Sequence, residues 1–201
     1  MGSGVPERLV RPAGPLRDER VVLRRWRVED LPDVHLGMQD PEVPRWTRIP
    51  EGNPPHEVRR YLDGQPRAQA DGAELVFALA DPVDDRFLGS ISLLRVVLEE
   101  HRAEVGYWLA PWGRGRGVLT SALRLLSRWA LTDGGFARLE LRIDQRNAPS
   151  LAVGERAGYV REGVMRSVQE HRGERIDLVL LSLLPSDLPS APAPGRAPSI
   201  P

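Results

Sequence analysis

Two residue types are missing from this chain of 201 residues. It contains no cysteine and no lysine, so all 28 of its basic residues are arginine. Without cysteine the chain can form no disulfide, no thiolate metal site and no cysteine-acyl intermediate. Without lysine it can form no Schiff base, and it cannot carry the Walker A phosphate loop, which requires Gly-Lys-Ser/Thr.

Net charge and long apolar runs are missing as well. The basic residues are balanced by 28 acidic ones, so the chain has no overall field that would favour nucleic acid. No run reaches the roughly 18 apolar residues of a membrane-spanning helix, and the N-terminus has no apolar signal core. The four histidines have no metal-ligand spacing. We therefore expect a cytoplasmic protein without a metal, which binds neither nucleic acid nor membrane.

The composition along the chain predicts one folded domain with two loose ends. Residues 1–15 are rich in proline and glycine and predict a flexible N-terminus. Residues 185–201 are rich in proline, alanine and serine and bury too little apolar surface to offset their ordering entropy, so they predict a disordered tail. The folded part is then 16–184, which is long enough for one proper core.

Apolar periodicity indicates a mixed α/β or α+β domain. Residues 117–131 carry a broad helical stripe of apolar positions, and residues 137–144 alternate as a strand does. The complete set of predicted strands is 19–26, 74–81, 86–96, 102–110, 137–144, 159–171 and 174–184. The predicted helices are 29–40, 53–64, 117–131 and 148–158.

A glycine-rich loop, Trp112–Gly117, lies between the strand 102–110 and the helix 117–131. A helix N-terminus offers unpaired N–H groups and the positive end of the helix dipole, and glycine lets a phosphate approach closely. Arg114 and Arg116 add charge. The dinucleotide fingerprint does not fit, because Val118 or Thr120 stands where its last glycine would be. The loop therefore indicates either a phosphate site or a solvated Arg/Gly turn.

The order of these features resembles the GNAT superfamily of N-acetyltransferases. The segments EVGYWLAPWGRGRGVLTSALRLLSRWA and ARLELRIDQRNAPSLAVGERAGYVREGVMR carry the resemblance, which is closest to the ribosomal-protein N-terminal acetyltransferase branch. The family signature Gln/Arg-x-x-Gly-x-Gly/Ala falls on Arg114–Leu119, with Leu119 in place of the small final residue. Aligning the signature two residues earlier makes it end on Gly117 but puts Trp112 in the Gln/Arg position.

The resemblance implies a fold and a cofactor. The fold is a mixed, mostly antiparallel sheet of about seven strands, flanked by about four helices. The sheet is splayed between two central parallel strands, 102–110 and 137–144. Acetyl-CoA would lie in that cleft, with its pantetheine arm on one strand and its pyrophosphate on the loop. The implied cofactor-binding residues are Trp108, Leu109, Ala110, Arg114, Gly115, Arg116, Gly117, Val118, Leu119, Thr120 and Asn147.

Three residues are candidates for catalysis by direct transfer in a ternary complex, which is the simplest route without cysteine. Glu104 could act as a base through water, or it could be a solvent-facing strand residue. Ser150 belongs to the family's N-x-x-S element and would lie near the sulfur. Asn147 in the same element could also be a helix N-cap. Tyr159 ranks below Ser150, because a tyrosine at this position is more often part of the core.

Two functions remain open from the sequence. One is an acetyl-CoA-dependent N-acetyltransferase acting on a primary amine, such as a protein N-terminus, an amino acid or a small amine. The other is a non-catalytic acyl-CoA-binding or sensing domain. By resemblance, the segment of about 27–70 selects the acceptor and Trp46 forms part of its wall, although Trp46 could equally be a core residue. A homodimer is also implied by the branch.

Overall fold

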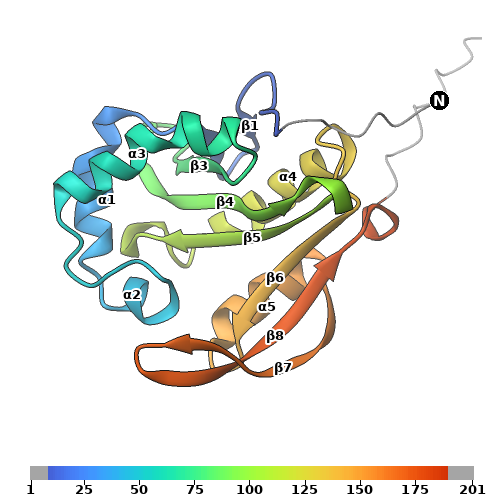
Figure 1. Ribbon diagram of the computed structural model, residues 1–201. Helices are drawn as coiled ribbons and strands as arrows, with labels where there is room; N and C mark the ends of the chain where they lie inside the picture. The colour runs from blue at the N-terminus through green and yellow to red at the C-terminus, as the bar shows by residue number, and fades with distance from the viewer. Residues whose placement is uncertain (1–8, 190–201) are drawn as a thin grey trace, which may run out of the picture.

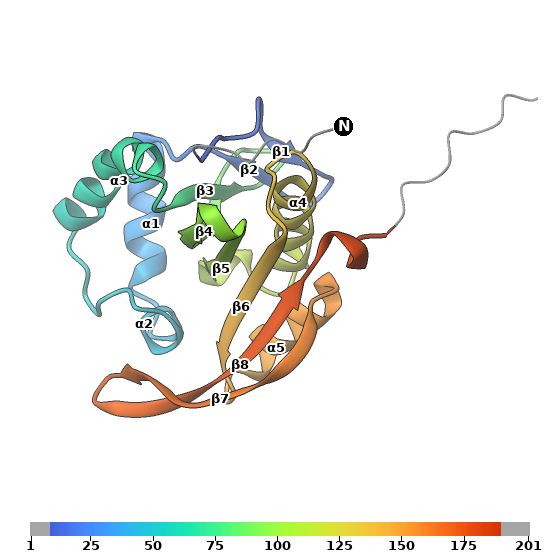
Figure 2. The ribbon, with the colours of Figure 1, turned by 45° about the vertical axis from the view of Figure 1, so that its right-hand side comes forward.

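The computed structural model describes residues 9–189, which form one open sheet with helices on both faces (Figures 1 and 2). Residues 1–8 and 190–201, with the predictions made for them, lie outside the described part of the chain. The strands are β1 (Leu16–Arg17), β2 (Val22–Arg24), β3 (Leu75–Ala80), β4 (Phe87–Val97), β5 (Arg102–Leu109), β6 (Arg138–Asp144), β7 (Val160–His171) and β8 (Glu174–Leu183). The helices are α1 (Leu31–Met38), α2 (Glu42–Trp46), α3 (Pro55–Ala70), α4 (Val118–Thr132) and α5 (Ala148–Ala157).

The eight strands have the order β1-β2-β3-β4-β5-β6-β8-β7, and every neighbouring pair is antiparallel except β5 and β6. The parallel pair is short, because only Arg102–Glu104 pairs with Arg138–Glu140. Beyond Glu104 the two strands separate, as Figure 1 shows. The predicted splayed sheet is therefore confirmed, and the split lies between the two strands that the sequence indicated.

The two faces of the sheet bury different helices (Figure 2). The larger core packs α4, through residues such as Leu123 and Leu126, against Leu139 and Leu141 of β6. A smaller cluster on the other face joins Val34 and Met38 of α1 and Val58 of α3 to Ala78 and Phe87. Side chains alternate along a strand, so consecutive residues of β5 reach opposite faces.

The predicted elements agree with the structure apart from details of number and length. The sheet has eight strands rather than about seven, and there are five helices rather than about four. The additional elements are β1, with two residues, and α2, with five residues and an internal proline. Both are too short to produce a periodic apolar pattern, so the sequence could not reveal them.

The described parts of both predicted loose ends make contacts with the folded domain. Leu9 is buried in the larger core, and the guanidinium of Arg11 lies 5.0 Å from the ring centroid of Phe77. Leu188 packs against the same core after the short turn Pro185–Asp187. Packing therefore extends beyond the predicted limits of 16 and 184, because single apolar residues in proline-rich segments still find apolar neighbours.

None of the helices in residues 9–189 is both long enough and apolar enough to cross a membrane.

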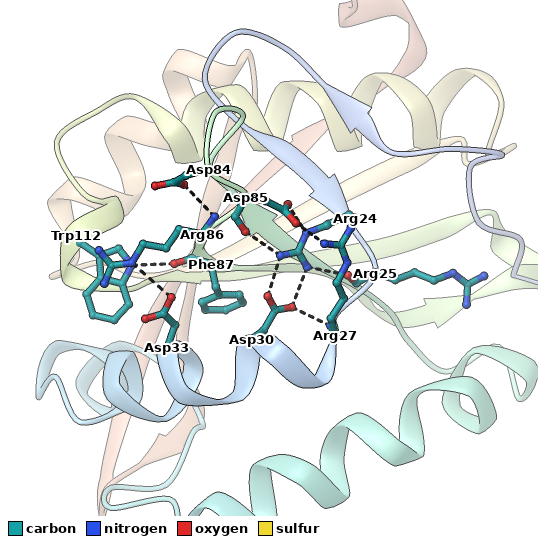
Figure 3. A network of polar contacts seen from close by, with 10 residues as sticks. All are labelled: Arg24, Arg25, Arg27, Asp30, Asp33, Asp84, Asp85, Arg86, Phe87 and Trp112. Carbon is teal, nitrogen blue, oxygen red and sulfur yellow. Dashed lines mark hydrogen bonds and ion pairs between the residues drawn. The ribbon is translucent and has the colours of Figure 1, made fainter.

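A buried ion pair fastens the start of α1 to the sheet (Figure 3). Arg24 of β2 donates two hydrogen bonds of 2.8 Å to the carboxylate of Asp30, and the two residues are 6% and 4% exposed. Arg24 also donates to the Oδ1 atom of Asp85 in the β3–β4 turn, at 2.7 Å. Because Asp30 immediately precedes α1, this contact sets where the α1–α3 layer lies relative to the strands.

Candidate functional site

The glycine loop, Trp112–Gly117, takes a backbone path that requires glycine at two positions. Gly115 and Gly117 have φ angles of +73° and +74°, in the left-handed region that other residues rarely adopt. Gly117 is the N-cap residue of α4. The alternation of glycine and arginine is therefore explained by backbone geometry, which turns the chain sharply from β5 into α4.

This turn leaves a row of backbone donors without acceptors. Within residues 9–189, the N–H groups of Gly115, Arg116, Gly117, Val118, Leu119 and Thr120 donate to no protein group, whereas Ser121 donates to the carbonyl of Gly117. Converging N–H groups at a helix N-terminus suit an anion, and the helix dipole adds to the attraction. The loop therefore has the geometry of a site for an anionic group such as a phosphate.

The two loop arginines are both held in ion pairs. Arg114 donates to both carboxylate oxygens of Asp40 at 3.2 Å, and Arg116 contacts Asp81 at 2.7 Å. Hydrogen bonds from the backbone of Val83 and from Arg116 hold the pKa of Asp81 below its usual range. Because these ion pairs offset much of the charge of the two arginines, the groups available to an anion are mainly the backbone N–H groups of the loop.

Two cavities lie next to the split in the sheet. The loop cavity, of about 760 Å³, is bounded by the glycine loop, the start of α4 and α5. The hairpin cavity, of about 810 Å³, is bounded by α3, the segment after α2, the sheet and the β7–β8 hairpin. Six residues line both cavities: Trp46, Thr47, Tyr107, Trp108, Asn147 and Ser150. The cavities therefore meet where β5 and β6 separate.

A pair of hydroxyl groups lies at this junction. The Tyr107 hydroxyl and the Ser150 Oγ atom are 2.9 Å apart, and burial raises the pKa of Tyr107 to about 12. Ser150 is positioned by Asn147, whose Oδ1 atom accepts a hydrogen bond of 3.1 Å from the Ser150 backbone N–H at the start of α5. Asn147 is thus a helix N-cap and a residue of the junction at the same time.

Tyr107 was not among the residues that the sequence singled out. One signal was available, because Tyr107 is the polar member of the alternating set Ala103, Val105, Tyr107 and Leu109, which faces the larger core. A tyrosine in an otherwise apolar row next to a strand split is a candidate for a functional hydroxyl. The sequence of the strand alone could not show which residue of α5 forms a hydrogen bond with this hydroxyl.

Glu104 lies on the floor of the hairpin cavity, at the last residue of the parallel pairing. Its side chain is 13% exposed and contacts Arg95 at 2.6 Å and Arg142 at 3.3 Å. Burial raises the pKa of Glu104, and the two arginines oppose that shift without cancelling it. Glu104 is therefore a partly buried carboxylate, and it is not the solvent-facing strand residue that was its alternative.

The other predicted site residues divide into two groups. Ala110 is fully buried, and its N–H donates to the carbonyl of Leu88 at 2.9 Å, so this N–H is not free to bind a ligand. Tyr159 is 3% exposed, and its hydroxyl lies 2.8 Å from Ser127 in the core, which argues against a catalytic role. Ala110, Arg116 and Tyr159 line neither cavity. Those that line the loop cavity are Trp108, Leu109, Arg114, Gly115, Gly117, Val118, Leu119, Thr120, Asn147 and Ser150.

The segment expected to form the acceptor wall does line the hairpin cavity. Trp46 of α2 lies between the two cavities, and its indole N–H donates to Glu42 at 2.8 Å. The carbonyl of Arg45 is hydrogen-bonded to the ring of His171 at 3.0 Å, and that of Pro44 accepts from Arg172 at 3.1 Å. Contacts from the β7–β8 hairpin therefore hold α2 across the mouth of the split.

Known proteins are similar to this chain in sequence. Residues 20–160 match the family described as "Acetyltransferase (GNAT) domain". The chain is 25% identical over 169 residues to a Bacillus licheniformis protein named "Uncharacterized N-acetyltransferase p20", covering 84% of this chain and 95% of that protein. It is 29% identical over 113 residues to the ribosomal-protein-serine acetyltransferase of Escherichia coli strain K12, covering 56% and 62%.

A solved structure agrees in fold. RimJ of Mycobacterium smegmatis, in complex with CoA-disulfide, is 24% identical with a TM-score of 0.78, and the match covers 89% of each chain. The resemblance to the Rim-type branch, which the order of sequence motifs indicated, is thereby confirmed. With a family match over 141 of its 201 residues, a splayed sheet and a glycine loop with free N–H groups at the start of α4, the chain belongs to the GNAT family of acetyltransferases.

Proposed function

We propose that this protein transfers the acetyl group of acetyl-CoA to the primary amine of an acceptor, by direct attack while both substrates are bound. The observation that supports this proposal is the meeting of the two cavities at Tyr107 and Ser150. Coenzyme A would bind in the loop cavity and the acceptor in the hairpin cavity. Two substrates held on either side of one junction react with the advantage of proximity.

The chain would hold acetyl-CoA mainly through backbone. The free N–H groups of residues 115–120 would bind the pyrophosphate. The edge of β5 that faces β6 has no strand partner beyond Glu104, so it can take hydrogen bonds from a pantetheine arm. When bound, acetyl-CoA supplies an acyl group already activated as a thioester.

Three side chains would move or hold protons. We propose that Glu104 accepts the proton of the attacking amine, directly or through one water, because it lies on the floor of the acceptor side and its raised pKa keeps it basic. Ser150 would donate its hydroxyl proton to the leaving thiolate of coenzyme A and take a proton back from water. Tyr107 would orient the Ser150 hydroxyl through the 2.9 Å hydrogen bond between them.

The class of acceptor is proposed as a primary amine, either a protein N-terminus or a smaller molecule. The Escherichia coli relative is named for acetylation of a ribosomal-protein serine, which favours testing peptide N-termini first. The hairpin cavity, at about 810 Å³, has room for a few residues of peptide or for a small amine.

Release of free coenzyme A from acetyl-CoA, measured with a panel of peptides and small amines, tests the proposal. We expect turnover with at least one amine, and a loss of about 10²-fold or more in kcat for Ser150→Ala. A protein that is stabilised by coenzyme A but turns over no amine would instead support the acyl-CoA-sensing alternative.

A further inference from the structure

The charged residues of the hairpin cavity are unequally paired. Four carboxylates line it, and three of them have an arginine partner: Glu57 contacts Arg60, Glu104 contacts Arg95 and Arg142, and Asp144 contacts Arg146 at 2.7 Å. The fourth, Glu74, has no arginine or histidine within ion-pair distance in the described part of the chain. Glu74 is therefore the one lining carboxylate without an ion-pair partner in residues 9–189, and Arg48, which also lines the cavity, donates to Gln169 at 2.8 Å and pairs with no carboxylate there.

Glu74 lies among aromatic and polar groups of α3. The Tyr61 hydroxyl donates to its Oε1 atom at 3.0 Å, and the Tyr61 ring meets Trp26 edge-on at 6.1 Å between centroids. Burial raises the pKa of Glu74, although hydrogen bonds from neighbouring side chains, including that of Gln65, oppose the shift. The Oε1 atom of Gln65 is itself buried without a donor. The indole N–H of Trp26 is likewise buried without an acceptor, so a donor and an acceptor are both left unpaired near Glu74.

The sheet register fixes how Glu74 lies relative to Glu104. Glu74 immediately precedes β3, whose first residue, Leu75, pairs with Leu93, so Glu74 lies opposite Leu94. Leu94 pairs with Glu104 on the next strand. With neighbouring strands ~4.8 Å apart, the backbones of the two glutamates are about 10 Å apart across the cavity floor.

We infer that the Glu74 end of the hairpin cavity binds a second cationic group of the acceptor, which makes the preferred substrate an amine that carries another positive charge. This inference rests on the proposed function, because it assigns the hairpin cavity to the acceptor. An ammonium or guanidinium group would pair with Glu74, and the rings of Tyr61 and Trp26, which also line the cavity, would favour it further. Such a group could come from a small diamine or from a basic side chain near a peptide N-terminus.

Matched acceptors test the inference in the wild-type protein. One pair is 1,5-diaminopentane and pentylamine, and the other is two short peptides that differ only by lysine or norleucine at the third residue. Hydrogen bonds to charged groups contribute about 1.5–3 kcal/mol, so we expect kcat/KM to be roughly 10- to 100-fold higher for the charged member of at least one pair. The pair that shows the preference identifies the source of the cation. Equal values within both pairs would overturn the inference.

Glu74→Gln keeps the size of the side chain and removes its charge. We expect it to raise KM for the charged acceptor by about 10-fold or more, with kcat and the uncharged acceptor little changed. Glu57→Gln is the control, because Glu57 also lines the cavity but is already paired with Arg60. Equal effects of Glu74→Gln on both members of a pair would contradict a charge-specific role.

A binding measurement separates this inference from the proposed function. Calorimetric titration of 1,5-diaminopentane and of the lysine peptide into the protein saturated with coenzyme A requires no turnover. If no amine is acetylated but one of these cations binds and Glu74→Gln weakens it, the subsite stands and the proposed function fails. If amines are acetylated and neither probe binds more tightly than its uncharged partner, the proposed function stands and the subsite fails.

Discussion

The two cavities are built from different parts of the chain. The loop cavity takes most of its lining from two continuous stretches, 107–120 and 147–156, and its anion site consists of backbone N–H groups. The hairpin cavity takes most of its lining from the segment 45–74, three strands and the β7–β8 hairpin, and its polar groups are side chains, eight of them arginine, aspartate or glutamate. The proposed cofactor side is thus defined by backbone geometry and the proposed acceptor side by side-chain chemistry.

This difference predicts which substitutions each side tolerates. A backbone site depends on conformation, so the two glycines with positive φ matter more there than the arginines between them. A side-chain site depends on individual charges and on the layer that carries them. The layer formed by α1–α3 contributes to the wall of the hairpin cavity. The ion pair between Arg24 and Asp30 holds this layer against the sheet.

The largest effect is expected for Glu104→Gln, on the acceptor side. The amide has the same size but cannot accept a proton, so kcat should fall by about 10²- to 10⁴-fold while coenzyme A still binds. Glu140→Gln is the control, because Glu140 also pairs with Arg142 but lines neither cavity. Steady-state kinetics and a coenzyme A thermal shift check both variants. Wild-type turnover by Glu104→Gln at neutral pH would show that the substrates are merely positioned.

The pH dependence of the same variant sharpens the assignment. Burial raises the pKa of Glu104, and a base must be unprotonated, so wild-type kcat should fall as the pH drops through that pKa. This acid limb should disappear in Glu104→Gln. The defect of the variant should also shrink at high pH, where more of the acceptor amine is already neutral. An identical acid limb in both proteins would assign it to another group.

The next effect is expected for Asp30→Asn, which loosens the acceptor side only. The substitution leaves the charge of Arg24 buried and incompletely paired, so we expect a loss of about 3–5 kcal/mol in the free energy of unfolding. Urea denaturation measures it. The acceptor KM should rise, whereas the coenzyme A shift should persist in the folded fraction. A loss below about 1 kcal/mol would mean that Asp85 alone holds Arg24.

A smaller effect is expected on the cofactor side, for Gly117→Asp. Coenzyme A at about 100 times its Kd should stabilise the wild-type protein by about 2.7 kcal/mol, and a carboxylate beside the free N–H groups should remove most of that gain. Gly173→Asp is the control for backbone strain, because Gly173 has a φ angle of +79° and lines neither cavity; a new Cβ atom would meet no neighbour there, whereas at Gly117 it would lie 2.8 Å from the Nη1 atom of Arg20, a side chain that can shift. An unchanged shift in folded Gly117→Asp would contradict the anion site.

The smallest effect is expected for Tyr159→Phe, which is the counterpart of Tyr107→Phe. Each substitution removes a hydroxyl that lies within 2.9 Å of a serine, one in the core and one at the junction of the cavities. Tyr159→Phe should cost about 1 kcal/mol of stability and leave kcat unchanged. Tyr107→Phe should instead lower kcat, because Ser150 loses its orienting partner. Similar kinetics for the two variants would remove Tyr107 from the proposed mechanism.

The order of the elements and the proposed cofactor side of the site could be predicted from local features of the sequence. Apolar periodicity is a local property, so α4, β5 and β6 were readable from their own residues. The glycine loop was readable because positive φ angles favour glycine at Gly115 and Gly117, and because a helix start carries free N–H groups wherever it occurs. Ser150 and Asn147 followed from a continuous motif.

The proposed acceptor side depends on contacts between residues that are far apart in the sequence. The 2.9 Å contact between Tyr107 and Ser150 joins residues 43 positions apart, and it exists because β5 and β6 separate after three paired residues. The same folding buried Tyr159 in the core and gave Glu104 its two arginine partners, while it left Glu74 without one among the described residues. The charge state of a side chain depends on which distant residues surround it, and no local pattern records those neighbours.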